Sequence, residues 1–245
     1  LSSVSDDPRA SQIDLSSSSS MDDTAPPARD WSLLPLDVLS SIFIRLGAVD
    51  VLTGAGLVCR SWLQAAKLPD VWRVVEIDDH GILHPRNLVA QHTMAKAAVE
   101  RSDGQLRVFA GKHFVTDDLI KYIVERSPSL TTLRLVSYSH VFSQQVASAI
   151  KESPLLELRS LELGDIDITV GELTAVLEYC PALEVLRLHN CLDIDDTHTL
   201  QAKFPRIKNL TLEWDNAYWS RFYTDTSSYS DSAPDSEDER TDGSM

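Results

Sequence analysis

A leucine pattern that returns about every 25 residues constrains the fold more than any other feature of this chain. Four segments share the frame Leu-x-x-Leu-x-Leu, the last with Ile207 in its first slot, and their middle positions are Leu133, Leu161, Leu186 and Leu210, in steps of 28, 25 and 24 residues. A repeat of this length indicates supersecondary units that stack, because one unit alone cannot bury its apolar side. We therefore predict a solenoid with these leucines in its core.

Each unit is predicted to pair a strand with a helix. Amphipathic stretches follow three of the strands, with apolar residues Leu119, Ile120, Ile123 and Val124, then Val146, Ala149 and Ile150, then Leu173, Val176 and Leu177. Each of these stretches ends at a proline, which stops a helix, and another proline precedes the last frame: Pro128, Pro154, Pro181 and Pro205. This order resembles the leucine-rich repeat, with short parallel strands and helices on the convex side.

The repeats are degenerate, and their first copies are weak. One copy places Leu106 and Val108 in the last two leucine slots, and Trp72, Val75 and Ile77 fit the frame before it. Only one unit offers the family's ladder asparagine, at Asn190. An aromatic segment is expected to cap the last strand, with a binding platform as the alternative; its residues are Trp214, Tyr218, Trp219, Phe222 and Tyr223.

A helical unit that is too small to form a hydrophobic core by itself precedes the repeats. Apolar residues at spacings of three and four predict one helix, with the face Leu36, Leu39, Ile42, Phe43 and Leu46. Pro35 and Asp37 suit its start, and Gly47 its end. A second amphipathic run from Val58 to Ala66 closes at Pro69. We expect two short helices whose apolar side chains need a partner.

The helical unit resembles an F-box. The matching residues are Leu34, Pro35, Leu36, Asp37, Val38, Leu39, Ile42, Phe43, Leu46, Val58, Cys59, Trp62 and Trp72, in the order and near the spacing usual for that family. The segments RLGAVDVL and LPDVWRVVEID are most similar to those of plant F-box proteins that carry leucine-rich repeats. The resemblance implies docking on a Skp-family adaptor, which links the chain to a cullin and so to ubiquitin conjugation.

The predicted adaptor-binding residues are apolar, and some must stay exposed on so small a unit. Pro35 is expected to shape the turn, and Leu39 and Ile42 to be central anchors. The whole set is Leu34, Pro35, Leu36, Leu39, Ile42, Leu46, Val58, Trp62 and Leu63. The alternative is that all of them pack onto the repeats.

Target recognition is expected on the concave strand surface, where side chains between the leucines point outward. The predicted target-binding residues are Thr132, Arg134, Glu162, Arg187, His189, Thr211 and Glu213. Mixed charge and small residues suit a polypeptide better than a small molecule. The alternative is an ordinary solvated surface.

Charge divides the chain into four predicted parts. Of the formal net charge of −15, residues 1–30 hold −4 and residues 224–245 hold −6, and both segments are expected to be disordered. The F-box is predicted at 31–71, and the repeats with their cap at 72–223. Met21 could also be the natural first residue of the protein. Residues 1–20 are then an upstream extension, and the alternative is that they are native sequence.

Residue patterns for bond chemistry are missing from the sequence. The three cysteines and seven histidines lack metal-ligand spacing, and no nucleophile or phosphate-binding motif occurs. Cys59 is expected to be a buried, inert thiol. Without clustered Lys and Arg, nucleic acid is a poor partner, and no apolar run is long enough for a membrane span. We expect no cofactor, and a reducing, cytoplasmic or nuclear location.

The fold prediction is α/β, with N-terminal F-box helices followed by a short leucine-rich solenoid of parallel strands. The predicted function is non-enzymatic: a substrate receptor of an SCF-type ubiquitin ligase, whose F-box binds the adaptor and whose repeats bind an unidentified protein target. The alternative is a leucine-rich regulatory protein that binds the adaptor without promoting turnover of a target.

Overall fold

A computed structural model describes residues 30–77, 87–136, 144–191, 194 and 197–214 of this protein. The two segments expected to be disordered lie outside the described residues, except for Asp30. So do four of the five aromatic residues expected to cap the last strand, Tyr218, Trp219, Phe222 and Tyr223.

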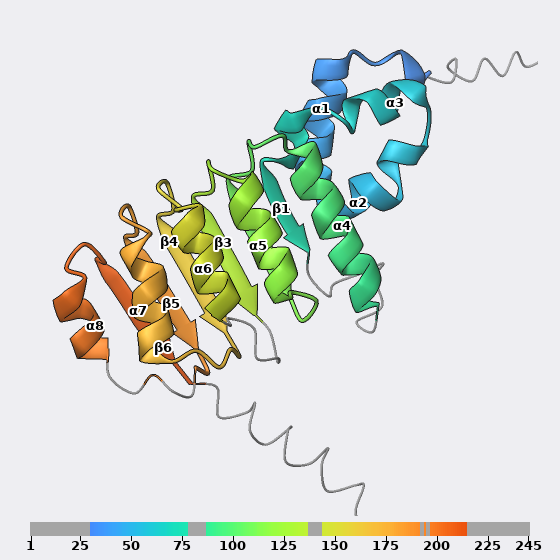
Figure 1. The fold of residues 1–245 in the computed structure, drawn as a ribbon. Helices are drawn as coiled ribbons and strands as arrows, with labels where there is room; N and C mark the ends of the chain where they lie inside the picture. Colours follow the sequence, from blue (N-terminus) through green and yellow to red (C-terminus); the bar gives the residue numbers. More distant parts are fainter. Residues whose placement is uncertain (1–29, 78–86, 137–143, 192–193, 195–196, 215–245) are drawn as a thin grey trace, which may run out of the picture.

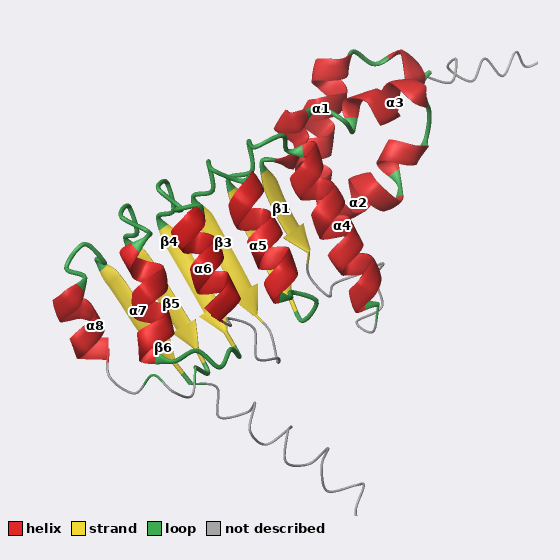
Figure 2. Ribbon diagram, viewed as in Figure 1, coloured by secondary structure: helices red, strands yellow, loops and turns green. Residues whose placement is uncertain are grey.

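Parallel strands in sequence order form one sheet, and helices cover one of its faces (Figures 1 and 2). The six described strands are β1 (Val74–Ile77), β2 (Val108–Lys112), β3 (Thr132–Val136), β4 (Ser160–Gly164), β5 (Val185–His189) and β6 (Asn209–Glu213). The covering helices are α4 (Leu88–Arg101), α5 (Asp117–Arg126), α6 (Gln144–Glu152), α7 (Val170–Glu178) and α8 (Thr197–Lys203). The predicted solenoid of parallel strands is confirmed.

The leucine frame is the core of the sheet. Leu133, Leu161, Leu186 and Leu210 are register partners across β3 to β6, and the first three are at most 1% exposed. The predicted helix residues Leu119, Ile120, Ile123, Val124, Ala149, Ile150, Leu173, Val176 and Leu177 are also buried. At about 25 cal/mol per Å² of apolar surface removed from water, this interior is the main stabilising term.

A repeated backbone pattern joins each unit to the next. The carbonyl of the residue before each of β1 to β5 accepts hydrogen bonds from two successive N–H groups of the next unit, at 2.8 to 3.1 Å. Before β1, for example, the carbonyl of Arg73 accepts from Arg107 and Val108. Immediately after β2, β4 and β5, the residues His113, Asp165 and Asn190 have positive φ. The ladder asparagine is therefore one of three residues that turn the chain at this position.

The weak copy at β2 was predicted in the wrong register. Phe109 pairs with Leu133 and Gly111 with Leu135, so Leu106 occupies the first leucine slot and not the second. A Cβ at Gly111 would lie 2.9 Å from the ring of Phe114. That ring fills the space that a leucine side chain takes in other units, which explains the missing leucine.

The helical unit contains three α-helices, where two were predicted. These are α1 (Leu36–Leu46), α2 (Ala48–Thr53) and α3 (Arg60–Ala65), with 3-10 turns at Trp31–Leu33, Ala55–Leu57 and Pro69–Trp72. No single described helix is long and apolar enough to cross a membrane. Only α1 together with Ala48–Leu57 reaches that length and composition, and the pair is bent by 120°.

Trp72 joins the helical unit to the repeats. Its side chain is fully buried, and its indole N–H donates to the carbonyl of Ala66 at 3.0 Å. The guanidinium of Arg101, on α4, lies 5.2 Å from the center of the Trp72 ring. Helix α4 also contacts α2 and β1, and α2 contacts β1. One apolar core therefore continues from Leu39 to Ile207.

Replacing Trp72 by alanine should destabilise the whole chain. Trp72→Ala leaves a large cavity in the shared core and is expected to lower the free energy of unfolding by about 3–5 kcal/mol, measured by chemical denaturation. Trp31→Ala, at a side chain that is 57% exposed, is the matched control and should cost less than about 1 kcal/mol. Equal losses for the two variants would contradict a core shared through Trp72.

Candidate functional site

Helix α1 is defined at both ends by local chemistry. Pro35 occupies its N-cap, and Asp37 lies in the first turn, where a carboxylate suits the positive end of the helix dipole. Gly47 ends the helix with φ of +88°, and its N–H donates to the carbonyl of Phe43 at 3.2 Å. Glycine fits there because positive φ is costly for other residues.

The inner side of the helical unit is held by an aromatic pair. Phe43 is fully buried, and its ring meets the ring of Trp62 edge to face at 5.6 Å. The Trp62 indole N–H donates to the carbonyl of Trp31 at 3.0 Å, and the Ser61 hydroxyl donates to the carbonyl of Ser32 at 2.9 Å. These bonds fix the chain before α1 against α3.

The predicted adaptor-binding residues divide into three groups by exposure. Five are exposed: Pro35, Leu36 (42%), Leu46 (43%), Val58 (63%) and Leu63 (38%). Three are partly buried and pack against the core: Leu34, Ile42 and Trp62. Leu39, predicted to be a central anchor, is fully buried and offers no exposed surface to a partner in this structure. It lies four residues before Phe43 on the helix face that turns inward.

Further apolar side chains are exposed on the same unit, although helical spacing did not single them out. They are Trp31 (57%), Leu33 (78%), Val38 (40%), Ile44 (52%) and Leu57 (72%). Together with Leu36, Leu46, Val58 and Leu63 they form what we call the exposed apolar set. Large apolar groups concentrated in so short a segment are typical of a protein-binding site. Of these five, Leu57 could have been predicted from the sequence, because it directly precedes Val58, which was already a predicted adaptor-binding residue.

Cys59 was expected to be buried, but its side chain is only half-buried at the start of α3. Its pKa is lowered, chiefly by a hydrogen bond with the side chain of Ser61, whose Oγ lies 3.1 Å from the sulfur, and further by the backbone of Trp62. Burial instead raises the pKa of Cys180 to about 12 and that of Cys191 to about 11. All three cysteines are free thiols.

The face of the sheet that the helices leave uncovered, here called the open face, carries the predicted target-binding residues. Arg134, Glu162, Arg187 and Thr211 are successive register partners across β3 to β6. The predicted columns of outward side chains are therefore present. Their role in binding a target stays a prediction.

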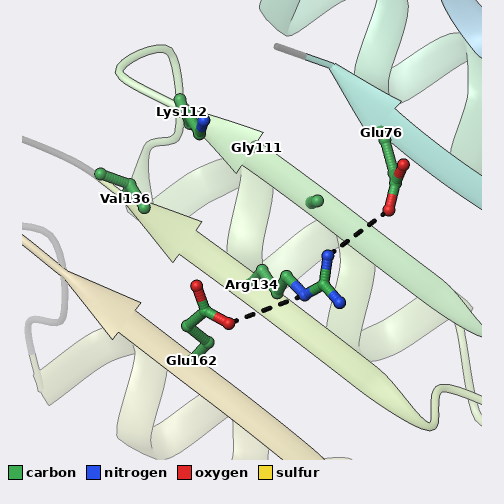
Figure 3. A pocket seen from close by; sticks show the side chains of 7 residues that line it. Glu76, Gly111, Lys112, Arg134, Val136 and Glu162 are labelled. Carbon is green, nitrogen blue, oxygen red and sulfur yellow. Dashed lines mark ion pairs between the residues drawn. The ribbon is translucent and has the colours of Figure 1, made fainter. Parts of the chain in front are cut away.

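Ion pairs link the charged residues of the open face. Arg134 reaches Glu76 at 3.6 Å and Glu162 at 3.7 Å, as Figure 3 shows. Glu162 also lies 3.6 Å from Arg187 and 3.7 Å from His189. The second ring nitrogen of His189 lies 3.4 Å from Glu213. Glu162 is the center of this network and is the least exposed of its members, at 22%.

A shallow hollow of about 170 Å³ opens where strand β2 has small residues. Ala110 and Gly111 line it together with Glu76, Arg134 and Glu162, and Figure 3 shows the three charged side chains beside Gly111. The walls are mostly polar. No three His, Cys, Asp or Glu side chains gather as metal ligands within the described parts of the chain.

Comparisons with known proteins agree with this architecture. The family model described as "F-box-like" matches residues 31–77, and the model described as "FBD-associated F-box protein At5g56370, LRR repeats" matches residues 105–217. The first match covers the helical unit and β1, and the second covers β2 to β6.

Three Arabidopsis thaliana relatives show the same similarity. Putative F-box/LRR-repeat protein 23 is 32% identical over 213 residues, which is 81% of this chain and 47% of the relative. F-box protein SKIP19 is 32% identical over 199 residues, 77% and 65%. Putative F-box/LRR-repeat protein 22 is 35% identical over 161 residues, 65% and 51%. The chain spans about half to two thirds of the length of these relatives.

Alkylation should separate the three thiols. Because its pKa is lowered, Cys59 has more thiolate than an ordinary cysteine at the same pH, and it should react with iodoacetamide in the folded chain. Cys180 and Cys191 should react only after unfolding. Mass spectrometry across a pH series should give a midpoint for Cys59 below the usual value, shifted upward in Ser61→Ala. Labelling of all three at one rate in the folded chain would contradict this.

Proposed function

Because the chain belongs to the F-box proteins with leucine-rich repeats, we propose that it is a substrate receptor of an SCF-type cullin–RING ubiquitin ligase. The F-box binds a Skp-family adaptor, and through it a cullin. The open face of the repeats holds a protein target. The setting is cytoplasmic or nuclear.

The observation that carries the adaptor proposal is the exposed apolar set. Its nine side chains are between 38% and 78% exposed, although neighbouring Leu39, Phe43 and Val51 are fully buried. The fold therefore already buries these three side chains, and the exposed apolar set is what a second protein would remove from water. At about 25 cal/mol per Å², covering such a surface drives a stable interface.

In this proposal the chain performs no bond chemistry. Holding a target beside a charged conjugating enzyme raises the effective concentration of the target's lysines near the reactive thioester. The core shared through Trp72 and α4 fixes the direction of the open face relative to the F-box. Rigid coupling limits the positions that a bound target can sample, which favours transfer to lysines on one side.

The adaptor proposal is tested by charging two exposed positions. Leu36→Asp with Val58→Asp places carboxylates in an apolar interface, and adaptor affinity should fall at least thirtyfold, about 2 kcal/mol. The measurement is binding of purified Skp-family adaptor to the full chain by calorimetry. Circular dichroism should stay unchanged because both side chains are exposed.

Leu156→Asp is the matched control, since Leu156 is 61% exposed but lies in the turn between α6 and β4. It should bind the adaptor like the unchanged chain. Leu39→Asp is unsuitable, because a buried carboxylate would unfold the unit. Undiminished adaptor binding by Leu36→Asp with Val58→Asp would contradict the proposed interface.

Target turnover is measured separately. Protein abundances are compared between cells that express the full chain and cells that express Leu36→Asp with Val58→Asp. A target should accumulate with the variant and decline with the full chain. Abundances that do not differ would favour adaptor binding without turnover.

A further inference from the structure

The outer edge of strand β6 has no strand beside it within the described part of the chain. The backbone N–H of Asn209 donates to the carbonyl of Glu184 at 3.1 Å, so the backbone polar groups of Asn209 face β5. Because these groups alternate along a strand, the N–H and C=O groups of Leu210 and Leu212 point to the outer side. Such unpaired backbone groups are a template for pairing with another strand.

The apolar side of β6 is less covered than that of its neighbour. Leu186 and Leu188 of β5 are fully buried, whereas their register partners Leu210 and Leu212 are only partly buried. Each of the other strands is followed by a described helix, but β6 is not. Trp214, directly after β6, is 44% exposed. The edge therefore offers apolar surface as well as unpaired backbone groups.

The side chain at the center of β6 is uncharged, unlike those of the strands before it. This position of the open face is Arg134 in β3, Glu162 in β4 and Arg187 in β5, but it is Thr211 in β6. Two copies of a strand with a charged center repel each other when they pair antiparallel about that center, because like charges then stand directly opposite. Edge strands are usually protected by charges or by proline. The center of β6 has neither.

The sequence of β6 reads nearly the same in both directions, as Asn-Leu-Thr-Leu-Glu. When two copies pair antiparallel about Thr211, Leu210 of one copy stands opposite Leu212 of the other. These are the residues with outward backbone groups, so each such pair exchanges two N–H···O bonds. Asn209 then stands opposite Glu213, where an amide N–H can donate to a carboxylate. The edge therefore complements itself, as an interface with twofold symmetry requires.

The hydroxyl of Thr211 supports the same pairing. Its Oγ1 is buried and has no hydrogen-bond partner among the residues that the structure describes. Opposite residues that exchange no backbone bonds have Cα atoms about 4.5 Å apart, which is the closest approach of side chains in an antiparallel pair. The two Thr211 side chains meet in this arrangement, and their hydroxyls can bond to each other. Leaving a buried hydroxyl unpaired is unfavourable, so this bond favours the pair.

We propose that β6 pairs antiparallel with β6 of a second copy of this chain, about a twofold axis through Thr211. The pairing joins the two sheets into one, with both open faces on the same side. It lies at the opposite end of the sheet from the helical unit (Figure 1). The exposed apolar set therefore stays free, and the inference does not depend on the proposed function.

A charge exchange at the twofold axis tests the proposal. The full chain should form a dimer in sedimentation equilibrium at concentrations up to about 100 μM. Thr211→Lys should weaken the dimer at least tenfold, and so should Thr211→Glu, because each variant places two like charges opposite each other. An equal mixture of the two variants should restore the dimer, because lysine then stands opposite glutamate. Loss of folding cannot imitate this result, since unfolded chains do not recover on mixing.

The matched control is Thr132→Lys, which adds the same charge to the open face of the inner strand β3. It should change the dissociation constant of the dimer by less than about twofold. Equal weakening by Thr132→Lys would overturn the proposal, because the effect would then follow net charge and not position.

Three other outcomes would also overturn the proposal. The first is a full chain that stays monomeric at the highest concentration. The second is a mixture of Thr211→Lys and Thr211→Glu that stays monomeric. The third is a monomeric full chain that forms the dimer only after removal of residues 215–245, because the chain's own C-terminal segment is then the occupant of the edge.

Discussion

Burial of the first strand against the helical unit is the constraint on which the rest of the structure depends. In a stack of repeats each inner strand shares its apolar side with two neighbours, but β1, like β6 at the other end, has a repeat on one side only. Helices α2 and α4 and the indole of Trp72 supply what the missing repeat would bury. The helical unit therefore caps the solenoid, and only the side chains that capping leaves exposed are available to the proposed adaptor.

Large apolar residues at a regular period made most of the repeat region predictable. Strands β3 to β6 and helices α5 and α7 have such residues in every expected slot, so their positions followed from spacing. Helix α4 was not predicted because it buries Ala95, Ala98 and Val99, whose small side chains give a weak periodic signal. The register of β2 was missed because an aromatic ring fills a leucine's place, and such substitution depends on three-dimensional packing.

The candidate adaptor site was harder to predict, since spacing identifies a helix face but not which of its residues face solvent. Leu36 and Leu39 are one turn apart on the expected face, yet one is 42% exposed and the other fully buried. That difference is set by how α3 crosses α1, which the ring contact between Phe43 and Trp62 fixes. The half-buried thiol of Cys59 has the same origin, because only the tertiary arrangement decides how much of a helix start is covered.

The tryptophan at the junction has a practical consequence for dissecting this protein. A fragment that stops at Val71, where the sequence places the end of the F-box, would lose the indole that closes its interior. The complementary fragment would begin with that indole and with Val75 and Ile77 laid bare on one side. Neither fragment contains a complete hydrophobic core, so each should aggregate when it is expressed alone. Biochemical work therefore requires the full chain.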